Sequence, residues 1–429
     1  MKLSAGRISQ YKVDNFQELK NKVLNWTTRF SIFCFLDNHQ FQIKPQVNEC
    51  LLAAGCDESF TSDDINGLEE LQHFINLQDG WLFGHLNYDL KNKIEELSSD
   101  HADPVAFPDI FFFKPQVLIR LNERLLEIEA VNPDEVYNEI LSASAFSDDH
   151  KKTYVLQSRV TQHEYIETIK KLKAHILRGD CYEINYCIEF FAEKAEINAW
   201  DIYKRLSKLS PNPFSAFYRV KDKYLLCASP ERFIRKNGNQ ILSQPIKGTS
   251  KRIEHNDELD EASKQQLIQS EKDRSENVMV VDLVRNDLSK VCEEGTVTVS
   301  ELFGIYSFPQ VHQMISTVEG RLKSNVLFTD IIKASFPMGS MTGAPKKRVM
   351  ELIEQYEKSR RGIFSGAVGY ISPGGDFDFN VVIRSIMYNE QRQYLSYQAG
   401  SAITYKSDPE SEWEECLLKA EAIKKVLSG

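Results

Sequence analysis

Two helices predicted from the hydrophobic pattern carry acidic side chains on faces that should be buried, and these are the first candidates for chemistry. The last predicted helix has an apolar stripe that includes Cys416 and Ile423. At about 100° per residue, Glu412, Glu415 and Lys419 fall on the same side of that helix. Charged groups at the edge of a core face must be paired or must bind a cation. A local salt bridge and a metal site both fit this pattern.

A second predicted helix, over residues 264–288, shows the same anomaly. Glu276 lies in its apolar stripe without an evident local partner, and Asp273 lies one turn earlier on the same side. Asp282 is embedded in the apolar run beside Arg285, which predicts a buried ion pair. Two helices that each offer an inward carboxylate could together hold a hard divalent cation. Magnesium takes one or two protein carboxylates and leaves positions for water and an anionic substrate.

A lysine between two turn-forming residues is the next candidate. In the segment ILSQPIKGTSK, Lys247 stands between Pro245 and Gly248, with Thr249 close by. Such a lysine could act as a nucleophile if burial lowers its pKa. The alternative is an ordinary exposed lysine in a turn, because most lysines are exposed. Upstream, Glu231 follows the end of an apolar strand in the segment CASPERF.

Two segments of small residues could bring the backbone close to an anion. The segment FPMGSMTGAPKKRVMELI contains Thr342 and Gly343 and leads into a helix, whose first N–H groups are free to bind an anion. It lacks the GxxxxGK[ST] spacing and is therefore not a nucleotide-binding P-loop. The segment AGSAI, residues 399–403, follows a strand, and its small side chains would let a carboxylate approach the backbone.

These candidates must be positioned by a mixture of strands and long helices. The pattern predicts strands at residues 30–36, 110–113, 182–191, 216–227, 367–371 and 381–388, and helices at 163–177, 264–288, 346–356 and 410–427. Asp408 is a good N-cap for the last helix. Hairpin-like groups of strands beside long helices favour an α+β fold. The polar segment 144–152 predicts a linker between an N-terminal region, 1–150, and a catalytic domain, 151–429, and we expect the two parts to share one compact body.

Composition excludes several classes of protein. The chain has 429 residues, of which 42% are hydrophobic and 27% charged, as in soluble globular proteins. No run of about 18 apolar residues and no signal-peptide pattern is present, so we expect a cytoplasmic protein without a membrane span. The net charge is −10 and no basic stripe occurs, which argues against nucleic-acid binding. None of the eight cysteines forms a CxxC pair, so we expect free thiols.

Seven strings in order along the chain resemble the chorismate-utilising enzymes, a family that includes anthranilate synthase component I, isochorismate and salicylate synthases, and aminodeoxychorismate synthase component I. The strings are SPERF, PIKGTSKR, EKDRSENVMVVDLVRND, GSMTGAPK, RRGIFSGAVGYIS, VVIRS and DPESEWEECLLKAEA. They cover about residues 160–427 densely, and GWLFGHLNYDL extends the resemblance faintly into the N-terminal part. The resemblance implies an α+β fold of two large packed antiparallel sheets with helices outside.

The same resemblance implies roles for the candidate residues. Glu276 and Glu415 would be Mg²⁺ ligands, with Glu412 and Asp273 in support, and the metal would hold the ring carboxylate of chorismate. Glu231 would be the general acid for the C4 hydroxyl. The residues implied in substrate binding are Arg384, which would clamp a carboxylate, Lys419 near the other carboxylate, Thr249, Thr342, Gly343, Phe364 in place of a usual tyrosine, Gly400, Ser401 with its hydroxyl, and Ala402.

Lys247 indicates the branch of the family. Most branches have alanine there, whereas lysine resembles the aminodeoxychorismate synthases. In that mechanism the lysine adds at C2 while the C4 hydroxyl leaves, and ammonia then adds at C4 and expels the lysine. Glu183 stands where isochorismate-type members have a lysine base, which speaks against their chemistry. Gln313 replaces a histidine that many members have, and His312 lies one position earlier.

The expected function follows from this branch. The chain has no glutaminase motif such as GxCxG, so ammonia would come from a separate glutamine amidotransferase subunit. The product would be 4-amino-4-deoxychorismate, on the route to 4-aminobenzoate and folate. Two alternatives remain open: anthranilate synthase component I, which Lys247 opposes, and an inactive chorismate-binding regulatory subunit. The missing histidine supports the inactive subunit, and the intact candidate carboxylates and lysine oppose it.

Overall fold

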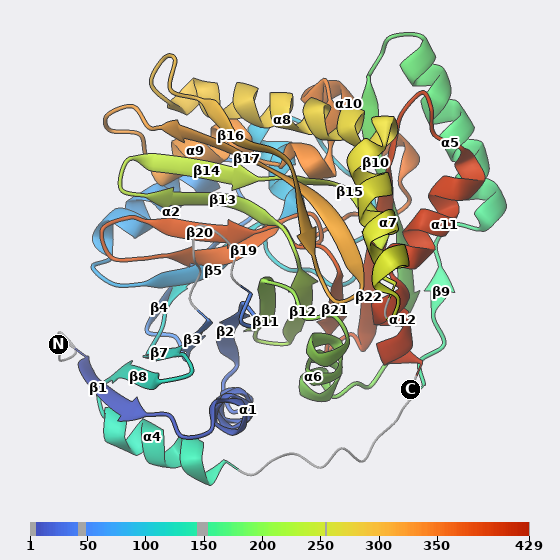
Figure 1. Ribbon diagram of the computed structural model, residues 1–429. Coiled ribbons are helices and arrows are strands. Elements are labelled where there is room, and N and C mark those ends of the chain that lie inside the picture. The colour runs from blue at the N-terminus through green and yellow to red at the C-terminus, as the bar shows by residue number, and fades with distance from the viewer. Residues whose placement is uncertain (1–5, 42–48, 144–152, 254, 429) are drawn as a thin grey trace.

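The computed structural model describes residues 6–41, 49–143, 153–253 and 255–428. The predicted linker at residues 144–152 lies outside this described part. Two large sheets pack against each other, and the strand pairings among the described residues are antiparallel (Figure 1). The predicted α+β fold of two packed antiparallel sheets with helices outside is confirmed.

The larger sheet has twelve strands in the described part of the chain. In spatial order they are β1 (Arg7–Lys12), β8 (Leu125–Ala130), β7 (Val117–Leu121), β3 (Cys50–Ala54), β2 (Ile32–Asp37), β11 (Phe214–Val220), β12 (Lys223–Ser229), β21 (Ser385–Asn389), β22 (Tyr394–Ile403), β10 (Glu183–Ala192) and β18 (Gly343–Ala344), with β9 (Gln157–Ser158) also paired to β10. Strands from both sides of the predicted linker therefore belong to the same sheet.

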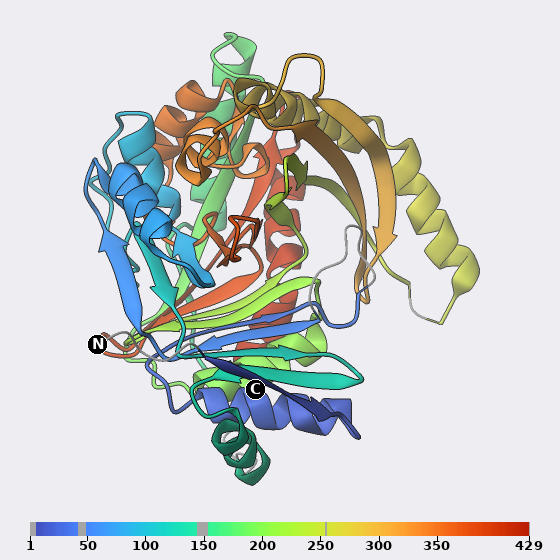
Figure 2. The same ribbon diagram turned by 90° about the vertical axis from the view of Figure 1, so that its left-hand side faces the viewer.

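The second sheet has ten strands among the described residues. In spatial order they are β15 (Ile246–Lys251), β17 (Val311–Arg321), β14 (Gln240–Gln244), β13 (Arg232–Asn237), β20 (Phe377–Asn380), β19 (Ala367–Ile371), β5 (Leu82–Leu86), β6 (Ile110–Lys114) and β4 (Glu58–Ser62), with β16 (Thr298–Ser307) paired to β17. Here too, blue N-terminal and orange-red C-terminal strands lie side by side (Figure 2). The two parts of the chain share one body, as expected.

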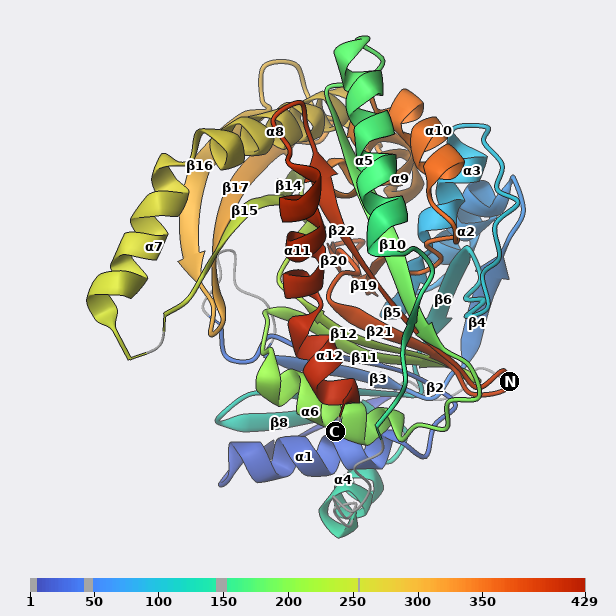
Figure 3. The ribbon, with the colours of Figure 1, turned by 90° about the vertical axis from the view of Figure 1, so that its right-hand side faces the viewer.

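Helices cover the outer faces of both sheets (Figures 1 and 3). The larger sheet is covered by α1 (Phe16–Thr27), α4 (Pro133–Ser142), α5 (Gln162–Leu177), α6 (Ala199–Leu209), α10 (Lys346–Tyr356), α11 (Pro409–Lys419) and α12 (Glu421–Leu427). The second sheet is flanked by α2 (Gly67–Leu77), α7 (Asp257–Gln269), α8 (Glu271–Val291) and α9 (Phe328–Ser335), and the short α3 (Lys91–Ile94) follows β5. None of the described helices combines the length and apolar character needed to cross a membrane.

The core has two layers, and alternation along single strands divides side chains between them. Phe33 and Phe35 of β2 pack with the helices outside the larger sheet, whereas Cys34 between them packs in the layer between the sheets. Phe83 of β5 and Phe113 of β6 fill the same inner layer from the second sheet. This double layer makes both sheets rigid supports for the segments that leave their edges.

Two predicted strands are wrong in the structure. Residues 216–227 form the hairpin β11–β12 instead of one strand, because the chain turns at Lys221 and Asp222, where Lys221 has a φ of 57° and its N–H donates to the carbonyl of Ser31. Residues 381–388 are interrupted as well: β20 ends at Asn380 and β21 begins at Ser385, and Arg384 between them has a φ of 52°.

The predicted helices are largely confirmed, with two breaks. Helix α10 has the predicted bounds, and the Asp408 side chain caps α11 by accepting a hydrogen bond from the N–H of Ser411 at 3.0 Å. The helix predicted over residues 264–288 divides at Ser270, whose hydroxyl oxygen accepts from the N–H of Asp273 and caps α8. The last predicted helix divides at Ala420, between α11 and α12.

Candidate active site

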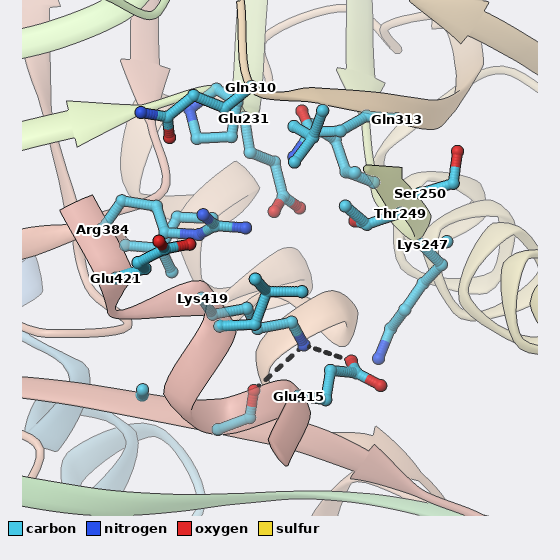
Figure 4. A pocket seen from close by; sticks show the side chains of 18 of the residues that line it. Glu231, Lys247, Thr249, Ser250, Gln310, Gln313, Arg384, Glu415, Lys419 and Glu421 are labelled. Atoms are coloured by element: carbon cyan, nitrogen blue, oxygen red, sulfur yellow. Dashed lines mark hydrogen bonds and ion pairs between the residues drawn. The ribbon is translucent and has the colours of Figure 1, made fainter. Parts of the chain in front are cut away.

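A pocket of about 1190 Å³ opens between β15, β17, α8, β22 and α11 and brings most of the candidate residues together. The side chains labelled in Figure 4, Glu231, Lys247, Gln313, Arg384, Glu415 and Lys419 among them, surround one space. Twelve predicted residues line it: Glu231, Lys247, Thr249, Asp273, Glu276, Gln313, Phe364, Arg384, Gly400, Ala402, Glu415 and Lys419. The sequence therefore predicted the lining of this pocket from segments that are far apart in the chain.

Four predicted residues lie next to the pocket without lining it. Ser401 points to the other face of β22, because side chains alternate along a strand, and its hydroxyl hydrogen-bonds with that of Tyr165 at 2.9 Å. The predicted contact of its hydroxyl with substrate does not fit this placement. The carbonyl of Thr342 accepts from the N–H of Asn185 at 2.7 Å, and Gly343 pairs with β10 so closely that a Cβ would lie 2.0 Å from a backbone oxygen. Glu412 is the fourth.

Lys247 is buried and ion-paired, unlike the lysine of an exposed turn. It lies inside β15, and its Nζ is 2.6 Å from Oε1 of Glu183 on β10. Burial alone would lower the pKa of Lys247, but the carboxylates of Glu183 and Glu276 raise it, and the net result is a raised pKa. The expectation of a lowered pKa is therefore wrong. In the free protein Lys247 is an ammonium ion held by Glu183.

Glu231 has the properties of a general acid. It connects β12 to β13, and its backbone carbonyl accepts a hydrogen bond from the N–H of Val381 at 3.0 Å. Its side chain is 3% exposed, and burial raises the pKa of its carboxyl group to about 7. A carboxyl group with this pKa holds a proton at neutral pH in a large fraction of molecules and can give it to a leaving group.

Gln313 and His312 point in opposite directions from β17. The Gln313 side chain lines the pocket, and its buried Oε1 has no hydrogen-bond partner. His312 is buried behind the strand, where its Nδ1 lies 2.8 Å from the hydroxyl of Ser307 and its Nε2 lies 3.2 Å from Oδ1 of Asp260. The placement agrees with the alignment that puts Gln313, and not His312, in the position of the family histidine.

This placement predicts different effects for two neighbouring substitutions. Gln313→Ala should lower the kcat/KM of the enzyme by about tenfold or more, because it removes a polar group that lines the pocket. His312→Ala should leave the kinetics close to those of the wild type and lower the melting temperature, because it removes contacts that tie β17 to α7. Steady-state kinetics and thermal unfolding of both variants measure this, and the reverse ranking would show that the segment is aligned one residue wrong.

Arg384 occupies the pocket in a backbone conformation that non-glycine residues rarely adopt. Its φ of 52° lies in the left-handed region, and its carbonyl accepts from the N–H of Ala228 at 3.2 Å. Burial lowers the pKa of its guanidinium to about 10, which leaves it charged at neutral pH. Its side chain forms no ion pair with any described residue, so a substrate carboxylate is the partner its chemistry calls for.

Lys419 and Glu415 form a second charged pair one helical turn apart on α11. The Nζ of Lys419 lies 2.7 Å from Oε1 of Glu415 and donates to the carbonyl of Gly400 at 3.0 Å (Figure 4). The cation of Lys419 lowers the pKa of the Glu415 carboxyl group to about 2. Glu415 is therefore a full carboxylate at the wall of the pocket, and Lys419 is anchored beside it.

The predicted metal ligands come together from α8 and α11. Glu276 is 6% exposed, burial raises the pKa of its carboxyl group to about 8, and its Oε1 has no hydrogen-bond partner. Oε2 of Glu412 is also buried without a hydrogen-bond partner. Asp273 lines the pocket near them, and burial raises its pKa. The salt-bridge and the metal-site interpretations of the inward carboxylates both apply. The carboxylates are partly ion-paired, and Glu276 and Glu412 each still have an oxygen without a hydrogen-bond partner.

These donors suit Mg²⁺ with an incomplete protein shell. Among the described residues, no group of three or more His, Cys, Asp or Glu side chains could hold a metal ion alone. Magnesium is usually bound through one or two carboxylates, with water and substrate oxygens completing its octahedron. Glu276 with its unpartnered oxygen and Glu415 with its full charge meet that requirement, with Glu412 and Asp273 behind them.

Sequence reasoning missed two contacts and misplaced one. It did not pair Glu183 with Lys247, because the two residues come from different sheets. It also missed Lys272, which lies one helical turn before Glu276 on α8; the i,i+4 spacing could have indicated this contact. The predicted ion pair of Asp282 and Arg285 exists at 2.9 Å, but both side chains are exposed, so its predicted burial is wrong.

Comparisons with known proteins show which family the chain resembles. A family model described as chorismate binding enzyme matches residues 34–425. The chain is 36% identical over 348 residues to aminodeoxychorismate synthase component 1 of Salmonella typhimurium, which covers 80% of this chain and 76% of that relative. It is 33% identical over 373 residues to an anthranilate synthase component I-like protein of Synechocystis, which covers 85% of this chain and 76% of that relative.

A solved structure supports the fold. Anthranilate synthase component I from Streptococcus pneumoniae superposes with a TM-score of 0.78 over 90% of this chain and 94% of that chain, at 24% sequence identity.

Proposed function

The chain belongs to the chorismate binding enzymes, and we propose that it is the chorismate-converting component of an aminodeoxychorismate synthase. The observation that carries this proposal is Lys247, a buried amine in the same pocket as Glu231 and Arg384. Curated relatives with that name, such as the Salmonella typhimurium protein, support the same choice of branch. The substrates are chorismate and ammonia, and the product is 4-amino-4-deoxychorismate.

The first half of the reaction uses Lys247 and Glu231. Arg384 and Lys419 bind the two carboxylates of chorismate and orient its ring between them. Lys247 gives a proton to Glu183, whose Oε1 is 2.6 Å from Nζ, and its free amine forms a bond to C2 of the ring. The ring double bonds shift, the C4–O bond breaks, and Glu231 protonates the departing hydroxyl group so that it leaves as water.

The second half of the reaction breaks the bond between Lys247 and the ring. Ammonia forms a bond to C4, the double bonds shift back, and the C2–N bond to Lys247 breaks. Lys247 takes its proton back from Glu183, and Glu231 takes one from the new ammonium group, which returns both to their starting states. A Mg²⁺ ion held by Glu276 and Glu415 would neutralise a substrate carboxylate and fix the position of the ring. Two displacements place the amine at C4 with the original stereochemistry.

Ammonia supply and location belong to the same proposal. The sequence has no GxCxG glutaminase motif, and we propose that a glutamine amidotransferase subunit delivers ammonia to this chain in the cytoplasm. The component 1 name of the Salmonella typhimurium relative supports a partner component.

Product analysis tests the function directly. The purified chain is incubated with chorismate, MgCl₂ and ammonium chloride, and the products are separated and identified by mass spectrometry. We expect 4-amino-4-deoxychorismate with ammonium and no product when glutamine replaces it. Anthranilate as the product would favour the anthranilate synthase alternative, and a folded chain that binds chorismate without converting it would favour the regulatory subunit.

The protonation state of Glu231 predicts the alkaline side of the pH profile. Because the acid form is the active one and its pKa is raised to about 7, kcat/KM for chorismate should fall as the pH rises through about 7. The concentration of free NH₃ must be held constant across the series. Glu231→Gln should lower kcat/KM by about 100-fold or more, since it cannot donate a proton. A profile that stays flat up to pH 9 would exclude Glu231 as the acid.

A further inference from the structure

The cation of Lys272 lies among three carboxylates contributed by two helices. Its Nζ is 2.9 Å from Oε1 of Glu412, 3.9 Å from Oε1 of Glu276 and 3.9 Å from Oε2 of Glu415. Lys272 and Glu276 come from α8, whereas Glu412 and Glu415 come from α11. A single positive charge therefore joins the two helices that carry the expected metal ligands.

The surroundings of Lys272 show what this charge does at the contact of the two helices. Glu412 is 1% exposed, and Lys272 is its ion-pair partner among the described residues. Removing the partner of a buried charge leaves that charge uncompensated, which is strongly destabilising. Glu276 is nearly as buried and faces the same ammonium group. Without Lys272, the acidic side chains of α8 and α11 would lose the positive charge that lies between them.

We propose that Lys272 is an internal counter-ion: it holds the carboxylates of α8 and α11 together when no divalent ion is bound, and it competes with that ion for them. The inference rests on the proposed function only in placing Mg²⁺ at Glu276 and Glu415. A divalent ion there takes over the two longer contacts at 3.9 Å, and Lys272 keeps its shorter contact with Glu412. Lys272 therefore makes the acidic site stable before loading and weakens its affinity for the metal.

The proposal predicts opposite changes in two measurements on Lys272→Met, a substitution that keeps most of the side-chain volume. In EDTA, the melting temperature should fall by about 3 °C or more, because Glu412 is left buried and unpaired. In a titration with MgCl₂ alone, the concentration that gives half of the thermal shift should fall by about tenfold, because a competing like charge is gone. Calorimetric titration with MgCl₂ checks the affinity independently.

The double variant Lys272→Met with Glu412→Gln separates the metal effect from folding. It removes the buried charge that the single variant leaves unpaired, so it should fold even where the single variant does not. Its MgCl₂ midpoint should lie between those of the single variant and the wild type, since the competing cation is gone but one supporting carboxylate is neutral as well. Lys290→Met is the matched control, because Lys290 also lies on α8 and forms an ion pair with Asp287. Asp287 stays paired after the substitution, since Lys346 lies 2.6 Å from it. The response of Lys290→Met to MgCl₂ should equal that of the wild type.

Each result decides one part of the argument. The proposal would be overturned if Lys272→Met changed neither the melting temperature in EDTA nor the MgCl₂ concentration at half of the thermal shift. Weaker Mg²⁺ binding by the variants than by the wild type would overturn it as well. A thermal response to MgCl₂ in the variants and none in the wild type would support competition by Lys272. If no protein responds to MgCl₂, the metal assignment in the proposed function fails, and the competing role of Lys272 fails with it. The melting temperature in EDTA then decides whether Lys272 holds the two helices together.

Discussion

Lys247→Ala is expected to lower the rate of 4-amino-4-deoxychorismate formation by about 1000-fold or more, because it removes the nucleophile that divides one difficult substitution into two easier ones. Any residual reaction should shift to products in which ammonia or water adds directly at C2. Steady-state kinetics with product identification by mass spectrometry measure both effects. Undiminished 4-amino-4-deoxychorismate formation in this variant would show that Lys247 is not the nucleophile.

Loss of activity in Lys247→Ala must be separated from loss of structure. The substitution leaves Glu183 buried without its partner at 2.6 Å, and breaking a buried pair costs about 3–5 kcal/mol. The double variant Lys247→Ala with Glu183→Gln removes this unpaired charge, so it should melt close to the wild type and remain inactive. Lys236→Ala is a control in the same sheet, where the lysine pairs with Asp376 and neither residue lines the pocket. It should keep wild-type kinetics.

A covalent intermediate gives a second way to identify the nucleophile. Wild-type protein incubated with chorismate and MgCl₂ in the absence of ammonia should gain the mass of chorismate less one water, because the C2–N bond forms as the C4 hydroxyl leaves. Intact-protein mass spectrometry detects the gain, and peptide mapping should place it on Lys247. An adduct on another residue would contradict the assignment.

Glu276→Gln is expected to abolish turnover at low MgCl₂, as is Glu415→Gln, because each removes one of two carboxylates that would hold a hard cation. A loss of about 100-fold or more in kcat/KM is expected for each, as for other groups that position charge in a transition state. Rates measured over a MgCl₂ series should show the largest loss at the lowest concentration. Full activity of either variant at limiting Mg²⁺ would remove that residue from the metal site.

The structure makes Glu276→Gln a good test of chemistry. Glu276 has a buried Oε1 without a hydrogen-bond partner, so a neutral amide of the same shape breaks no hydrogen bond at that atom and relieves the cost of burying a charge. The melting temperature of Glu276→Gln in EDTA should therefore equal or exceed that of the wild type. Glu410→Gln is the control for α11, because Glu410 is exposed in its first turn. It should not change the dependence on MgCl₂.

Local signals predicted the elements whose stabilising interactions are also local. The bounds of α10 and β19 and the Asp408 cap of α11 agree with the sequence, since helix periodicity, strand composition and capping depend on residues close in the chain. The carboxylates on apolar helix faces were recognised for the same reason. A charged residue within an apolar stripe contradicts the hydrophobic pattern of its helix, and such contradictions concentrate at functional sites.

Features that depend on distant segments were not predictable. The apolar run around Arg384 predicts a continuous strand, but the chain leaves the sheet there and places Arg384 in the pocket with a positive φ. Nothing in that run marks a left-handed residue, because no glycine or asparagine occupies the position. The pKa of Lys247 depends on Glu183 from the other sheet, so sequence reasoning, which did not include that contact, predicted the wrong direction.

Each sheet combines strands from early and late parts of the chain, and this has a consequence for folding during synthesis. The early strand β2 needs β11 as its neighbour, β5 needs β19, and β12 needs β21. As the chain leaves the ribosome, one edge of β2 and one edge of β5 therefore remain unpaired until strands much later in the sequence have been synthesised. Unpaired strand edges can associate with other chains. We expect translation to be the stage at which this protein depends most on chaperones, because neither sheet can close until nearly the whole chain has emerged.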